Sequence, residues 1–185
     1  MSKELIELLN YILPGLITLW LFYGLTSHKK PPQFERIIEA LIYTIFIQFF
    51  IAVLKLFIEI KSEHEIIFSI SIAMIFGVIL SYFSNNDIFH KLLRFLKITK
   101  QTSYPSEWFG VFNKYKRFIV LNLKDGRRLF GWPIEWPSDP NNGYLLMTNL
   151  YWFNNKNIIK IDQIEFLLIN TNQIEWIEFY EDVKV

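Results

Sequence analysis

Cysteine is absent from this chain of 185 residues, and histidine occurs only three times. Without cysteine the chain has no disulfide scaffold, no thiolate zinc site and no thiol nucleophile. His28, His64 and His90 all lie in the first half of the chain. The second half therefore offers neither Ser-His-Asp nor Cys-His catalysis and lacks the common ligands of transition metals.

Common motifs of nucleotide-binding proteins and zinc proteases are missing as well. The patterns GxxxxGK[ST], GxGxxG and HExxH do not occur in the chain. Asp139, Asn141 and Asn142 offer oxygen ligands to a hard cation, but DPNNG is more typical of a turn. Carboxylate hydrolysis through Glu135, Asp139 or Asp162 has no support beyond the presence of these groups. We therefore expect no enzymatic activity, no cofactor and no metal.

Neither sign of charge is in excess, since 19 Lys and Arg stand against 18 Asp and Glu. The placement of the charges differs between the halves. In residues 1–100 they form short clusters between long apolar runs, whereas in residues 101–185 they are spread through alternating sequence. This pattern predicts a membrane domain over 1–100 and a soluble domain over 101–185. Because the soluble domain has no basic stripe, we do not expect it to bind nucleic acid.

Three long apolar runs carry almost no charge. They cover residues 8–25, 40–57 and 66–83, and Lys55 is their only charged side chain. A helix of about 18–20 residues crosses the hydrocarbon core of a bilayer. The alternative is a set of core helices in a soluble protein, but such helices normally keep a polar face. The runs therefore favour an integral membrane protein, and three helices leave much surface for packing into a homo-oligomer.

The first run is interpreted as a retained span rather than as a cleaved signal peptide. Glu4 and Glu7 precede it, and no small-residue cleavage site follows it. Pro14 and Gly15 lie inside it and should bend the helix or loosen one of its turns.

Basic residues on the flanks predict how the chain is oriented. Seven Lys and Arg lie in the segments 26–36 and 84–100, against two on the opposite side. The positive-inside rule then places the N-terminus outside and residues 84–185 in the cytoplasm. Lys55 is expected near the outer end of its span, where it can snorkel and meet Glu59 one turn on.

Residues 86–100 predict a short amphipathic helix next to the membrane. Asn86 or Asp87 is suited to cap its start. Its basic side chains are Lys91, Arg94, Lys97 and Lys100. Such a helix normally lies at the anionic lipid interface. The alternative is a basic flank that packs on the soluble domain.

Strand signals dominate the soluble domain after a short helix expected over 104–115. The expected strands are 117–123, 128–132, 143–153, 164–169 and 174–179. Asp125-Gly126 suits a hairpin turn, Gly131 marks a bend or bulge, and a break is expected near Asn149. The fold class is therefore α+β, with an SH3-like or Sm-like antiparallel β-barrel that removes most exposed edges. The alternative is a simple antiparallel sheet backed by the helix.

A loop rich in proline and tryptophan joins the second and third expected strands. Trp132 and Trp136 each precede a proline, which favours extended backbone. With Tyr151 and Trp152 they form a candidate docking surface for a protein partner. The alternative is that these rings cover the core of the barrel.

Three segments resemble an uncharacterised family of small prokaryotic membrane proteins. They are FIVLNLKDGRRLFGWP (118–133), YLLMTNLYWF (144–153) and EFLLINTNQIEWIEF (165–179). The family pattern combines N-terminal membrane helices, a V-x-L-K-D-G-R hairpin and a terminal I-x-x-I-E-F strand. LPGLITLWLFYGLT and FERIIEALIYT in the first two spans are also similar to it. The resemblance implies membrane residence, no established activity and no catalytic residues.

We therefore predict a non-enzymatic adaptor of the inner membrane. It would sit in the lipid bilayer as a homo-oligomer and present a small β-barrel to a cytoplasmic protein. The alternative is a membrane-acting effector of a phage-defence or toxin system, whose helices signal or permeabilise the membrane.

Overall fold

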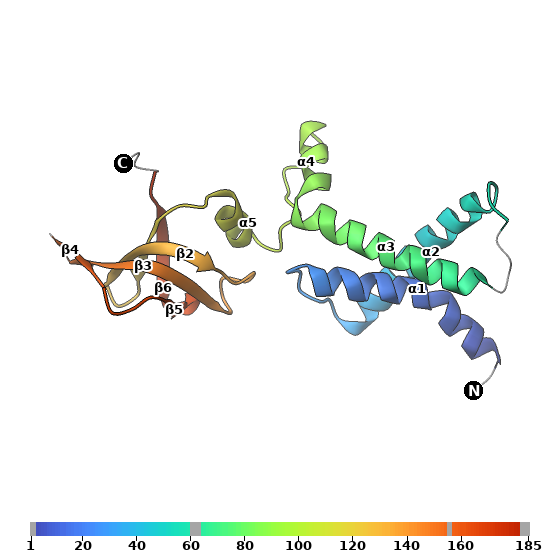
Figure 1. The fold of residues 1–185 in the computed structure, drawn as a ribbon, viewed down its shortest axis with the longest axis horizontal. Coiled ribbons are helices and arrows are strands. Elements are labelled where there is room, and N and C mark those ends of the chain that lie inside the picture. The colour runs from blue at the N-terminus through green and yellow to red at the C-terminus, as the bar shows by residue number, and fades with distance from the viewer. Residues whose placement is uncertain (1–2, 60–63, 155–156, 182–185) are drawn as a thin grey trace. The chain divides into compact units, whose positions relative to one another are not determined.

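The computed structural model describes residues 3–59, 64–154 and 157–181. The chain divides into two compact units, Met1–Tyr104 and Pro105–Val185. The first unit is helical, and the second is built mainly from strands (Figure 1). The expected α+β class is therefore confirmed, and each unit is described separately below.

Four helices form the first unit. They are α1 (Lys3–Leu25), α2 (Gln33–Leu54), α3 (Glu65–Asn85) and the short α4 (Ile88–Phe95). The first three are long and apolar enough to cross a membrane, as the sequence predicts. Helix α2 starts and ends earlier than the expected span. Lys55 therefore follows the helix, and its Nζ pairs with Glu65 Oε1 at 2.8 Å instead of meeting Glu59.

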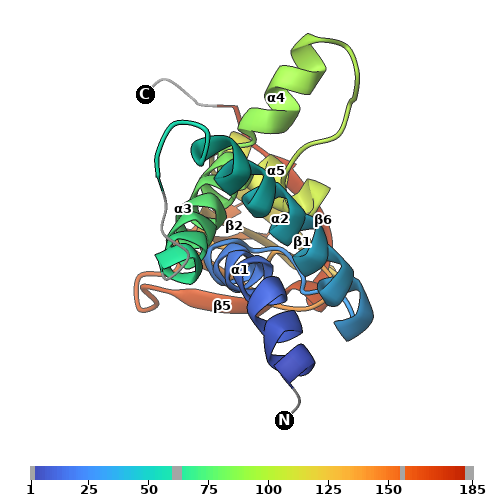
Figure 2. The same ribbon diagram turned by 90° about the vertical axis from the view of Figure 1, so that its right-hand side faces the viewer.

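Helix α1 packs along both α2 and α3, which contact each other much less (Figure 2). The side of α3 that faces the bundle carries small buried residues, namely Ser69, Ala73, Gly77 and Ser81. A Cβ atom on Gly77 would lie 3.0 Å from the Leu21 Cβ. Small residues at such positions allow the backbones of membrane helices to approach closely.

Two buried hydroxyl groups join the three long helices. Gly15 N–H donates to Thr44 Oγ1 at 3.1 Å, which ties α1 to α2. Thr18 Oγ1 lies 3.1 Å from the carbonyl oxygens of both Pro14 and Ala73, and the second contact ties α1 to α3. The turn beside Pro14, expected to be loose, is therefore held by neighbouring helices.

The second unit opens with α5 (Glu107–Lys114) and continues as strands. These are β1 (Ile119–Leu123), β2 (Arg128–Glu135), β3 (Tyr144–Asn154), β4 (Asn157–Lys160), β5 (Leu167–Asn170) and β6 (Ile174–Phe179). The antiparallel order is β4-β3-β2-β1-β6, and β5 pairs with β3 beside β4. Sequence analysis missed β4, which has only four residues.

The expectation of a closed barrel is wrong. Within the described ranges β5 pairs only with β3 and β6 only with β1, so no ladder joins the two ends of the sheet. The 3-10 turn η2 (Thr171–Gln173) connects β5 directly to β6. The sheet therefore curves far enough for one turn to link its ends, but strand pairing does not close it.

The predicted turns of the sheet are present. Gly126 has a φ of 83°, and Asp125 Oδ1 accepts the Arg127 N–H at 3.0 Å, which closes the β1–β2 hairpin. The β2–β3 register shifts around Gly131, opposite Asn149, whose φ is 52°. The break expected near Asn149 is therefore a bulge within one continuous strand.

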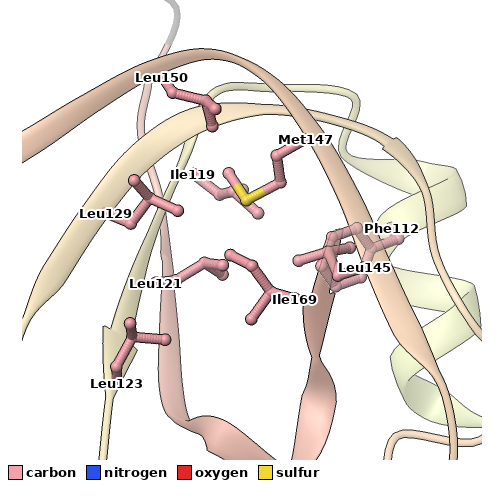
Figure 3. Close-up of a cluster of buried hydrophobic side chains, with 9 residues drawn as sticks. All are labelled: Phe112, Ile119, Leu121, Leu123, Leu129, Leu145, Met147, Leu150 and Ile169. Carbon is pink, nitrogen blue, oxygen red and sulfur yellow. The ribbon is translucent and has the colours of Figure 1, made fainter. Parts of the chain in front are cut away.

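A single hydrophobic core lies on one face of the sheet. Its buried side chains are Phe112, Ile119, Leu121, Leu123, Leu129, Leu145, Met147, Leu150 and Ile169. They come from β1, β2, β3 and β5 and from α5, which contributes Phe112, and Figure 3 shows them converging. Ser106 caps α5 by accepting the Phe109 N–H at 3.1 Å. The helix expected over 104–115 thus backs the sheet.

Candidate docking surface of the strand unit

The face of the sheet opposite the core is aromatic. The outer aromatic face consists of the rings of Phe118, Phe130, Trp132, Tyr151, Phe153 and Tyr180, and strand pairing places Trp176 on the same side of the sheet. Phe130 lies at its centre and stacks on Phe118 with ring centroids 5.1 Å apart. Tyr151, Phe153 and Tyr180 meet Phe130 edge-on at 5.6–6.0 Å. Val120 is fully buried although it points to this face, because the rings cover it.

An ion pair holds one end of the outer aromatic face. Arg128 donates to Glu178 at 2.7 Å, and its guanidinium lies 5.4 Å from the centre of the Phe153 ring. Asn122 and Trp176 also donate to the Glu178 carboxylate. Burial raises the pKa of Glu178, but these hydrogen bonds and the Arg128 charge outweigh burial and hold the pKa below its usual value. This end of the face is therefore charge-compensated.

The four predicted docking residues do not form one surface. Trp132 and Tyr151 lie on the outer aromatic face. Trp136 packs on the core residue Phe112 with ring centroids 5.3 Å apart. Trp152 also packs against the core, and Arg127 lies 5.2 Å from its ring centre. Successive residues of a strand point to opposite faces, which separates Tyr151 from Trp152.

Trp132 and Trp136 nevertheless line the same pocket at the end of β2. This Trp pocket has a volume of about 240 Å³ and is lined by Phe112, Lys116, Trp132, Pro133, Ile134 and Trp136. The β2–β3 register shifts between Pro133 and Glu135. The chain thus brings two rings from different faces of the sheet to the same opening.

Basic side chains lie beside the Trp pocket. Lys116 lines it, and Lys114 and Arg117 flank the Tyr115 ring at 4.9 and 5.7 Å. The hydrogen bond and charge of Lys114 lower the pKa of the exposed Tyr115 hydroxyl. No ion pair engages these three basic residues in the part of the chain that the structure describes. Their positive charge is therefore available to a partner.

The candidate cation ligands of the DPNNG segment act in a turn. Asp139 Oδ1 accepts the N–H of Asn141 at 2.9 Å. Asn141 also lines a second pocket of about 370 Å³ with Trp108, Lys124 and Thr171. The indole N–H of Trp108 is buried there without a hydrogen-bond partner among the described residues.

The basic residues predicted at the membrane interface belong to the helical unit. Helix α4 ends at Phe95 rather than at residue 100, because Lys97 adopts a left-handed φ of 57°. Lys91 Nζ donates to the Asn86 carbonyl oxygen at 3.0 Å, and Lys91, Lys97 and Lys100 are all exposed. Exposed apolar side chains accompany them, namely Phe89, Leu92, Phe95, Leu96 and Ile98.

Arg94 pairs with a carboxylate within its own unit. It donates to Asp87 Oδ2 at 2.6 Å, and Asp87 Oδ1 accepts the Ser103 N–H at 2.7 Å. Asp87 precedes α4, as predicted, but its side chain does not cap the helix. Burial raises the pKa of Asp87, yet the hydrogen bonds of Arg94 and Ser103 hold the pKa below its usual value. The carboxylate thus fastens the segment after α4 to the end of α3.

Two histidines reach the same serine. His90 Nδ1 lies 2.6 Å from Ser103 Oγ. Burial lowers the pKa of His28, and its hydrogen bond to the Ser103 backbone acts in the opposite direction. Sequence analysis missed this cluster because its members are up to 75 residues apart and no spacing motif joins them.

No protein-family model and no curated protein matches this chain. Among solved structures, this chain is similar to a heptameric archaeal Sm protein. The two chains are 12% identical, and the alignment covers 39% of this chain and 97% of that chain with a TM-score of 0.32.

Proposed function

We propose that this protein is a membrane-anchored adaptor whose strand unit captures an acidic segment of a cytoplasmic protein. The observation that carries the proposal is the Trp pocket with its uncompensated lysine. Trp132 and Trp136 wall a pocket of about 240 Å³, and Lys116 lies at the same opening. The three apolar helices would hold this surface next to the bilayer.

The chemistry of the Trp pocket favours an acidic peptide that carries an apolar anchor residue. Aromatic walls stabilise a buried apolar side chain, and tryptophan is the residue type most enriched at interface hot spots. Lys114, Lys116 and Arg117 flank Tyr115 in the sequence, and their positive charges attract carboxylates. Charge complementarity of this kind raises association rates and excludes basic competitors.

The proposal includes an orientation and an assembly. The excess of basic residues in segments 26–36 and 84–100 supports a cytoplasmic strand unit and an N-terminus on the other side. In each apolar helix only 22% of the span is buried. Most of the helix surface is therefore free to meet lipid or a second copy, which supports a homo-oligomer.

Defined peptides test the proposal with the full chain in mild detergent. The probes are fluorescent 12-residue peptides with a central Leu or Trp flanked by Asp and Glu, and matched peptides with Lys and Arg in the flanks. Fluorescence anisotropy should show binding of the acidic set only. Lys116→Gln should weaken that binding, whereas Lys124→Gln, outside the Trp pocket, should not. Equal binding of both peptide sets, or of neither, would refute the proposal.

A further inference from the structure

A second site lies in the helical unit, where α1 and α2 approach each other beside the loop that joins them. This α1–α2 pocket has a volume of about 470 Å³. Leu16, Leu19 and Trp20 of α1 line one wall, and Lys30, Gln33 and Arg36 line the other. No part of the proposed adaptor surface lies in this unit.

The α1–α2 pocket is cationic at one end and apolar at the other. Lys30 precedes α2, and Arg36 lies in the first turn of that helix. Leu16 and Leu19 lie two turns inside the apolar stretch of α1. Trp20 lies between these levels with 75% of its surface exposed.

Arg36 lines the pocket, and one of its side-chain donors has no hydrogen-bond acceptor among the described residues. Its Nε–H is buried and has no partner among the described residues. The nearby carboxylate of Glu39 instead accepts the Tyr23 hydroxyl at 2.8 Å. Lys30 is exposed and forms no ion pair in the described ranges. A half-buried guanidinium that has no carboxylate partner binds well to an anionic oxygen such as that of a phosphate.

We infer that the α1–α2 pocket binds an anionic membrane phospholipid. The lipid phosphate would accept hydrogen bonds from Arg36 and Lys30, and Gln33 would contact the headgroup. One acyl chain would lie along Leu16 and Leu19. The apolar half of the pocket favours a phospholipid over a free phosphate ion, because a free phosphate has no apolar group to pack against the apolar wall. Basic pockets between membrane helices on the cytoplasmic side commonly hold anionic headgroups.

The inference is tested by lipid competition at Trp20, the only tryptophan among residues 1–104. The full chain is reconstituted in vesicles of brominated phosphatidylcholine, which quenches nearby tryptophan, and a Trp20→Phe variant isolates the Trp20 signal. Unbrominated phosphatidylglycerol is then added in increasing proportion. The salt concentration is about 0.5 M, because this screens attraction to exposed charges.

Phosphatidylglycerol should relieve the quenching, because the pocket should bind it about tenfold more tightly than phosphatidylcholine. Arg36→Gln and Lys30→Gln should each remove most of this preference. Lys30 lies outside the helices, so its variant remains informative if Arg36→Gln does not fold. Lys29→Gln is the matched control, since Lys29 carries the same charge on the same loop but does not line the pocket.

Three results would overturn the inference. The first is that the unchanged chain shows no preference for phosphatidylglycerol. The second is that Lys29→Gln reduces the preference as much as Lys30→Gln, which would indicate diffuse surface attraction. The third is that dissolved inorganic phosphate or glycerol phosphate displaces phosphatidylglycerol at millimolar concentration, which would indicate a site for free phosphate.

Discussion

The amide N–H of Gly15 donates to Oγ1 of Thr44 over 3.1 Å, so the turn of α1 beside Pro14 is held by α2. The contact depends on the missing side chain of Gly15. A Cβ atom there would lie 1.8 Å from the carbonyl oxygen of Ala40. The two helices can therefore approach this closely only with glycine at position 15.

Gly15→Ala should force α1 and α2 apart. Overpacking of a tight interface costs about 1–3 kcal/mol, and the Thr44 hydrogen bond would be lost as well. We expect a clear fall in the melting temperature of the purified chain in mild detergent. Circular dichroism measures this melting. Gly24→Ala is the control, because a Cβ at Gly24 meets nothing within 4 Å. Equal melting of both variants would contradict this account of the helix contact.

Asp87→Asn should release the segment that follows α4. The Ser103 N–H donates to Asp87 Oδ1 at 2.7 Å, and Arg94 needs the carboxylate charge. We expect the Ser103 amide to exchange hydrogen at least about tenfold faster in the variant, since a charge-assisted hydrogen bond is lost. Hydrogen-exchange mass spectrometry measures this change. Unaltered protection of Ser103 would show that the Asp87 contact does not hold the segment.

The same contact predicts a pH dependence. The pKa of Asp87 is lowered in the folded chain, so its contribution to stability is complete above the ordinary carboxyl pKa of about 3.9. The contribution is lost as the pH falls through the lowered pKa. Ser103 protection, corrected for the intrinsic exchange rate, should therefore stay constant from about pH 7 to 5 and fall only in stronger acid. A decrease already near neutral pH would point to the histidines instead.

Trp132 and Trp136 should differ in what their removal changes. Trp136 packs on Phe112, which is 2% exposed in the core, whereas Trp132 lies on the outer aromatic face against Phe118. We expect Trp136→Ala to lower both stability and peptide binding. Trp132→Ala should lower binding with the smaller loss of stability. Thermal unfolding and peptide anisotropy on the same samples separate the two effects, and a reversed order would refute the assigned roles.

The absence of cysteine makes the orientation directly measurable. Ser27→Cys and Glu59→Cys place single thiols in exposed positions on opposite sides of α2. In intact cells an impermeant maleimide should label Cys at position 59 and not at position 27. Labelling of both positions after lysis is the control. The opposite pattern would place the strand unit outside the cytoplasm.

The sequence predicts the helices well where an apolar run is uninterrupted, and less well at their ends. The start of α2 includes Glu35, Arg36 and Glu39, which a search for uncharged spans excludes. A helix can continue beyond the hydrocarbon core, because its backbone hydrogen bonds do not depend on the bilayer. The first charged side chain therefore does not mark the end of the helix. The same charged turn supplies Arg36 to the α1–α2 pocket.

The strand unit was harder to predict because β2 and β3 carry apolar side chains on both faces of the sheet. Alternation along β1 places Ile119 and Leu121 on the core side of the sheet. Phe130, at the centre of the outer aromatic face, was not identified, because an aromatic residue in a strand is first assigned to the core. Closure of the barrel depends on pairing between residues far apart in sequence, which no local pattern specifies.

Photocrosslinking from the Trp pocket in living cells is the most direct test of the adaptor proposal. Benzoylphenylalanine replaces Trp132 in one strain and Lys124 in another. We predict that position 132 forms an adduct with a cytoplasmic protein, that the crosslinked peptide is rich in Asp and Glu, and that Lys116→Gln in the same chain reduces the adduct. Position 124 should not form it. No adduct from position 132, or the same adducts from both positions, would contradict the proposal.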